Sequence, residues 1–153
     1  MLDSKIQNRL LQNWLAVQQA VGVAAEKHDR DPSSIQIVGV SKYVDEETTL
    51  GLVQAGCTQL GESRPQMLWQ KAESGKFDSN VQWHLIGHLQ KNKIRKALPH
   101  CDWLHTVDST ALAHSVDRIA GELKRRARVL LQVNIAEDEA KFGFSSEDVK
   151  AAL

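Results

Sequence analysis

Residues 35–42 read Ile35-Gln-Ile-Val-Gly-Val-Ser-Lys42, a short and nearly continuous apolar run that ends on a lysine. Runs of this kind are typical of strands buried on both faces of a parallel sheet. Lysine is rarely buried, so the ammonium group at the end either extends to solvent or is held there for chemistry. The stretch therefore predicts a buried parallel strand that delivers Lys42 to its C-terminal end.

Strand and helix patterns alternate along the rest of the chain. An amphipathic helix is expected over residues 2–26, ahead of this first strand. Four more strands, each followed by a helical pattern, are expected over residues 58–61, 81–86, 103–107 and 128–135. Asp45, Pro65 and Ser109 mark the expected beginnings of three helices. The five strand starts lie 22 to 25 residues apart, and this alternation predicts a parallel sheet with right-handed crossovers.

An open doubly wound sheet and a (β/α) barrel both fit this pattern. The barrel is favoured because every strand ends in polar residues: Lys42, Glu62, Ser63, His84, His88, Asp108, Ser109 and Asn134. Barrel sites are assembled from the C-terminal ends of many strands, whereas an open sheet concentrates its site at one switch point. We therefore expect an α/β fold of the TIM-barrel type, incomplete here, with about five of eight βα units.

Side-chain alternation along the strands predicts the lining of the lumen. If Lys42 points inward, Val38 and Val40 point inward with it. The same rule places His84 and Asn134 on the inner face of their strands, so the upper layer of the lumen would hold Lys42, His84 and Asn134. An amine in such a largely apolar, water-poor pocket becomes a nucleophile toward aldehydes.

Composition and charge exclude several classes of function. The 153 residues are 42% hydrophobic and 25% charged, with a formal net charge of zero, so no global attraction to nucleic acid or anionic membranes is expected. No run approaches the roughly 18 apolar residues of a membrane span, and the N-terminus lacks a signal-peptide core. A cytoplasmic protein is the expectation. The basic stretch over residues 90–96 is interpreted as a solvated helix face.

Metal, disulfide and nucleotide sites are not expected either. Cys57 and Cys101 occur singly, without the spacing of a zinc site or a secretory context that favours a disulfide. His84 and His88 are four residues apart, but one lies in a strand and the other in the following turn, so they do not share a helix face. The glycines form neither a dinucleotide-binding nor a P-loop grouping.

Five blocks of sequence point to one family: Val38-Gly-Val-Ser-Lys-Tyr43, Leu60-Gly-Glu-Ser-Arg-Pro-Gln66, Trp83-His-Leu-Ile-Gly-His-Leu-Gln-Lys-Asn-Lys93, His105-Thr-Val-Asp-Ser109 and Leu130-Leu-Gln-Val-Asn-Ile-Ala-Glu-Asp-Glu-Ala-Lys-Phe-Gly143. Together they resemble the pyridoxal 5′-phosphate (PLP) homeostasis proteins, single-domain relatives of the N-terminal barrel of alanine racemase. The resemblance covers roughly the first three-fifths of a family member. It implies that residues 1–153 form a single PLP-binding barrel domain whose C-terminal portion is absent.

The resemblance also assigns a cofactor site. Lys42 matches the lysine that forms the internal aldimine with PLP, and Ser63, His84 and Asn134 are the other expected cofactor-binding residues. Ser63 stands where the family usually has an asparagine, so a hydroxyl replaces an amide beside the cofactor. The family's phosphate-binding segments, which follow later strands, have no counterpart in this chain.

Three functions remain open at this point. The first is a carrier that holds PLP and acts in vitamin B6 and amino-acid homeostasis, without turnover, with PLP-dependent enzymes as candidate partners. The second is an amino-acid racemase, which needs a second acid/base group that related racemases take from a tyrosine on another domain; the single tyrosine here is Tyr43. The third is a barrel fragment with a structural role only. The family implies a monomer, and exposed strand edges would allow this shorter chain to associate.

Overall fold

A computed structural model describes residues 2–138 and 140–152, and its centre is a five-stranded parallel sheet. The strands are β1 (Gly39–Val40), β2 (Gln59–Glu62), β3 (Gln82–Leu85), β4 (Trp103–Val107) and β5 (Val129–Leu131). Each strand pairs with the next in sequence, so the order in space is β1-β2-β3-β4-β5. A doubly wound sheet reverses its strand order at a switch point, whereas a barrel wall keeps it.

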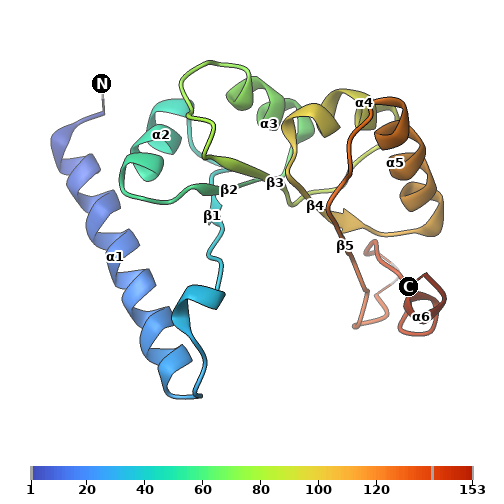
Figure 1. Cartoon of the computed structure of the whole chain (residues 1–153), viewed down its shortest axis with the longest axis horizontal. Helices are drawn as coiled ribbons and strands as arrows, with labels where there is room; N and C mark the ends of the chain where they lie inside the picture. Colours follow the sequence, from blue (N-terminus) through green and yellow to red (C-terminus); the bar gives the residue numbers. More distant parts are fainter. Residues whose placement is uncertain (1, 139, 153) are drawn as a thin grey trace.

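Helices cover one face of this curved sheet (Figure 1). They are α2 (Glu46–Gln54), α3 (Pro65–Ala72), α4 (Ile94–Ala97) and α5 (Thr110–Glu122), while α1 (Ser4–Glu26) flanks α2 and α6 (Asp148–Ala152) follows β5. Short 3₁₀ turns are η1 (Pro32–Ser34), η2 (Lys91–Lys93) and η3 (Leu98–His100). The concave face carries no helix layer in Figure 1. The expected incomplete (β/α) barrel is therefore confirmed.

Local sequence signals set the helix beginnings. Asp45 Oδ1 accepts a hydrogen bond from the Thr48 amide at 2.8 Å, and Ser109 Oγ accepts one from the Leu112 amide at 3.3 Å. Pro65 is the first residue of α3, where its missing amide hydrogen is not needed. These three predictions are confirmed. The helical pattern expected after the strand at 81–86 forms only a short helix, α4, of four residues flanked by 3₁₀ turns.

The outer strands are shorter than the sequence predicts. The strand expected over 35–42 is reduced to Gly39–Val40, and the one expected over 128–135 is reduced to Val129–Leu131. Both predictions were wrong in extent because each outer strand hydrogen-bonds to one neighbour only, so fewer backbone groups are paired. Burial differs as well, since the side chain of Val40 is 55% exposed.

The hydrophobic core lies between the sheet and helices α3 to α5. In the strand register Leu60 lies beside Trp83 and Glu62 lies beside Leu85, and all four are buried. The other face presents Val40, Gly61 and His84 side by side. This second face corresponds to the lumen of a complete barrel, and it agrees with the predicted inward direction of Val40 and His84. No helix among the described residues is long and apolar enough to cross a membrane.

Candidate functional site

The candidate site lies at the sheet edge where the five strands end. Because the strands are parallel, their C-terminal ends meet at one edge, as in barrel enzymes. The polar residues that follow the strands are Lys42, Ser63, His88, Asp108 and Asn134. Elements far apart in the sequence therefore supply one rim.

Lys42 lies in the turn after β1 and its side chain is exposed. Its Nζ atom is 5.0 Å from the ring centroid of Tyr43, and that ring is itself 88% exposed. The expectation of a water-poor, apolar pocket around Lys42 is wrong for this structure. The concave face of the sheet carries no helix layer in Figure 1, and the side chains of Lys42 and Val40 are both exposed to solvent.

Ser63 follows β2, is half-buried, and makes a very close backbone contact with Gly87 at the end of β3. A Cβ atom built on Gly87 would lie 2.0 Å from the Ser63 carbonyl oxygen. Gly87 also accepts a hydrogen bond through its carbonyl from Thr106 Oγ1 at 2.7 Å. The ends of β2, β3 and β4 are thus joined at a position where only glycine fits, a role that the sequence analysis did not assign to Gly87.

His84 is only 2% exposed and belongs to a polar cluster on the lumen face. Its Nε2 lies 2.8 Å from Gln59 Oε1, and its Nδ1 lies 2.8 Å from His105 Nε2. Because the Gln59 oxygen can only accept, His84 carries its proton on Nε2, and His105 donates to Nδ1. The ring also stacks on Trp103, with centroids 6.4 Å apart. Both nitrogens of His84 are therefore engaged within the sheet.

Burial keeps this histidine pair neutral. Removal from water and, to a smaller extent, repulsion from His105 together lower the pKa of His84 to about 4, against a smaller opposing effect of Asp102. Burial also lowers the pKa of His105. The sequence analysis did not identify Gln59 and His105 as members of this cluster, although they lie within the strands expected over residues 58–61 and 103–107.

Asn134 closes the loop that follows β5. Its side-chain nitrogen donates to the Asp138 carbonyl at 2.9 Å, and its backbone amide donates to the Phe144 carbonyl at 2.9 Å. Gly143, which has a φ of +137°, packs directly on this backbone. The Asn134 side chain thus bonds within its own loop. No hydrogen bond or ion pair joins any two of Lys42, Ser63, His84 and Asn134, all of them described residues.

A second group of residues joins the loops after β3, β4 and β5. His88 Nδ1 lies 3.2 Å from Asp108 Oδ2, and the His88 ring stacks on Phe142 with centroids 4.4 Å apart. These contacts hold the His88 side chain at the rim, between the loops after β4 and β5. Within residues 2–138 and 140–152, no group of three or more His, Cys, Asp or Glu side chains could hold a metal ion.

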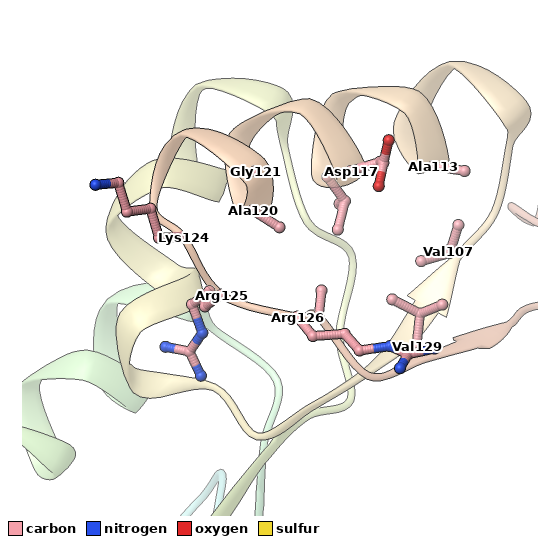
Figure 2. A pocket seen from close by; sticks show the side chains of 11 residues that line it. Val107, Ala113, Asp117, Ala120, Gly121, Lys124, Arg125, Arg126 and Val129 are labelled. Carbon is pink, nitrogen blue, oxygen red and sulfur yellow. The ribbon is translucent and has the colours of Figure 1, made fainter.

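A separate cleft of about 520 Å³ opens between α5 and strands β4 and β5 (Figure 2). Ala113, Val116 and Ala120 of α5 and Val107 and Val129 of the strands line it. These residues lie on the helix-covered side of the sheet. The sheet therefore separates this cleft from the lumen and from Lys42.

Known proteins show the same combination of sequence and fold. No protein-family model matches the chain. A pyridoxal phosphate homeostasis protein of Synechocystis sp. is 38% identical over 125 residues, which are 80% of this chain and 56% of that protein. PipY of Synechococcus elongatus, solved with PLP bound, is 38% identical with a TM-score of 0.73, over 86% of this chain and 60% of that one.

The chain is a relative of the pyridoxal phosphate homeostasis proteins. It spans about three-fifths of the length of these homeostasis-protein relatives. An alanine racemase of Clostridium difficile, solved with cycloserine, is 18% identical with a TM-score of 0.64, over 77% of this chain and 33% of that one. At that identity the likeness shows the fold alone, which is the barrel that the sequence resemblance implied.

Proposed function

We propose that the chain is the Lys42-bearing part of a PLP-binding protein that acts in vitamin B6 and amino-acid homeostasis. The observation that carries the proposal is the likeness to PipY, which was solved with PLP bound, over 86% of this chain. Lys42 supports it, because it lies in the turn after β1, at the rim, with an accessible amine. As the chain spans about three-fifths of its relatives, the proposal concerns the whole protein of which these residues are a part.

The wall beside Lys42 suits the aromatic ring of the cofactor. A Cβ atom on Gly61 would lie 3.2 Å from Val38 and 3.3 Å from Ile86, so these apolar side chains pack closely over the glycine. When bound, the cofactor supplies an electrophilic aldehyde. The Lys42 nitrogen would bond to the aldehyde carbon with loss of one water molecule. Ser63, at the end of the next strand, is the proposed polar contact.

The roles proposed for His84 and Asn134 follow from their partners. His84 is bonded to Gln59 and His105 and would support the floor of the lumen as a neutral ring. Asn134 would hold the loop after β5 at the rim. His84 and Asn134 would thus affect cofactor binding indirectly, by positioning the backbone and side chains around the cofactor.

Other lysines are less suited to bond the cofactor. Lys71 is 3% exposed and its ammonium group lies within 3.1 Å of four oxygens, so it offers no free nucleophile. Lys141 lies 3.4 Å from Asp138 in a loop with a largely exposed side chain. Among the lysines of residues 2–138 and 140–152, only Lys42 combines an accessible amine with a place in the turn directly after a strand.

The proposed role is a carrier without turnover of its own. The names of these relatives describe homeostasis proteins and not enzymes. A racemase needs an acid/base group on each face of the cofactor. Tyr43 is adjacent to Lys42 on the same turn, so it does not supply a group from an opposing element. Deuterium exchange at the α-carbon of amino acids in the presence of PLP would reveal a racemase.

Reductive labelling tests the assignment of Lys42. The chain is mixed with an excess of PLP, reduced with borohydride, digested and mapped by mass spectrometry. Label concentrated on Lys42, and lost from that peptide in Lys42→Ala but not in the control Lys141→Ala, is the expected result. Label found mainly on Lys141 or Lys93 would show that the lysine assignment is wrong.

A further inference from the structure

A buried ion pair lies directly behind the turn that presents Lys42. Lys71 of α3 is 3% exposed and Glu62 of β2 is 1% exposed, and Lys71 Nζ lies 2.6 Å from Glu62 Oε1. The ammonium group has four oxygen acceptors and only three hydrogens. The other three acceptors are Thr49 Oγ1 at 3.0 Å and two backbone carbonyls, Ser41 at 3.1 Å and Val44 at 3.0 Å.

The two carbonyls bracket the turn that contains Lys42. Residues 42 and 43 are exposed, whereas Ser41 is 1% exposed and its Oγ donates to Glu62 Oε1 at 2.8 Å. The Ser41 amide is bonded to the Gly61 carbonyl at 2.9 Å, and the Val44 amide to the Ser41 carbonyl at 3.2 Å. Both ends of the turn therefore converge on one buried cation, while the amine between them projects to the rim.

Stability alone gives little reason to keep this pair. A buried ion pair must recover the cost of removing two charges from water, and replacing both partners by uncharged residues of similar size is often neutral or stabilising. The carbonyls of Ser41 and Val44 both accept hydrogen bonds from Lys71, so its ammonium group links the two ends of the turn. The ion pair is therefore suited to fix the backbone conformation of the turn of residues 41–44.

We infer that Lys71, held by Glu62, is a positioning residue that sets the turn of residues 41–44 and so the place of the Lys42 amine. This inference rests on the proposed reaction of Lys42 with PLP. Lys71 would not touch the cofactor, because it lies buried on α3, on the helix-covered side of the sheet. Its effect passes through two backbone carbonyls to the residue between them.

The test replaces both charges together, because Lys71→Met alone would leave the buried Glu62 carboxylate without a counter-charge. The variant is Glu62→Gln/Lys71→Met, in which the new side chain at position 71 cannot donate to the two carbonyls. The matched control is Glu46→Gln/Lys76→Met, which removes a solvent-accessible ion pair between neighbouring elements by the same chemistry. PLP is the probe, and borohydride trapping measures the labelling of Lys42 against that of Lys141 in the same molecules.

We expect the rate of Lys42 labelling, relative to Lys141, to fall by about tenfold or more in Glu62→Gln/Lys71→Met, since a small misplacement of a reacting group has effects of this size. Amide hydrogen exchange of residues 42–44 should become faster, and the control should match the unmodified chain in both. Unchanged labelling together with unchanged exchange in the folded variant would overturn the inference.

Two further outcomes separate this inference from the proposed function. If the unmodified chain is not labelled at Lys42, the proposed function fails, and the exchange of residues 42–44 alone decides whether Lys71 positions the turn. If Glu62→Gln/Lys71→Met does not fold, Glu62→Leu/Lys71→Met takes its place, because an apolar pair is the replacement that buried sites tolerate best. The same two measurements then support or overturn the inference.

Discussion

Gly87→Ala tests how tightly the strand ends are packed at the rim. The added methyl group would lie 2.0 Å from the Ser63 carbonyl oxygen and 2.7 Å from its carbonyl carbon. Non-bonded heavy atoms settle at about 3.5–4.0 Å, so the ends of β2 and β3 must separate by more than ~1 Å. The hydrogen bond from the Ile86 amide to the Glu62 carbonyl, 2.9 Å long, lies in the path of that movement.

The expected cost combines two effects. Forcing a methyl group into a packed site costs about 1–3 kcal/mol, and a weakened backbone hydrogen bond costs about 0.5–1.5 kcal/mol. We therefore expect Gly87→Ala to lower the free energy of unfolding by about 2–4 kcal/mol, which for a chain of this size lowers the Tm by about 5–15 °C. Urea unfolding followed by fluorescence measures the change, since the chain holds 4 tryptophans.

Gly22→Ala is the matched control for this prediction. Gly22 lies inside α1, and nothing is within 4 Å of a Cβ atom built there. The same substitution should therefore stabilise the chain by about 0.5–1 kcal/mol through helix propensity. If Gly87→Ala unfolds at the same urea concentration as Gly22→Ala, the close contact between Gly87 and Ser63 is not a feature of the folded chain.

Three further predictions concern protons, thiols and the cofactor. Because the folded pKa of His84 is about 4, below its ordinary value of 6.5, the folded chain resists a proton that the unfolded chain accepts, so stability is full above pH 6.5 and falls as the pH drops toward 4. The contribution of His84 to this loss in the free energy of unfolding should be about 3 kcal/mol at most. Urea titrations at pH 7 and pH 4.5 should show a smaller loss of stability in His84→Gln than in the unmodified chain. Equal losses in the two would exclude His84 as the cause. Burial raises the pKa of the Cys101 thiol to about 11 and also raises the pKa of Cys57. A thiol reagent should therefore label both cysteines only as fast as the chain unfolds. Fast labelling under native conditions would contradict their burial. Absorbance titration should show that these 153 residues bind PLP at least tenfold more weakly than a full-length relative. The expected difference corresponds to one to three charge-assisted hydrogen bonds to the phosphate, which are worth about 1.5–3 kcal/mol each. Equal retention of PLP by the two proteins would place the phosphate site within this chain.

Features governed by neighbouring residues could be predicted from the sequence alone. The caps at Asp45 and Ser109, the start of α3 at Pro65 and the bounds of β4 all agree with the structure. Each depends on groups within one turn or one strand, so the signal and its effect lie in the same few residues. The inward direction of His84 and Val40 followed from the two-residue period of a strand for the same reason.

Features that depend on distant partners were decided by the tertiary structure. The length of β1 and the exposure of Lys42 depend on which strands lie beside β1, and no residue of the 35–42 stretch carries that information. His84 meets a partner 21 residues away, and Lys71 reaches a carbonyl 30 residues away. A lone lysine in a helical pattern is normally a solvated charge. Lys71 becomes a buried donor only because α3 packs against β2 and against the turn after β1. Burial depends on the neighbours that the fold brings together, and these lie far from Lys71 in the sequence.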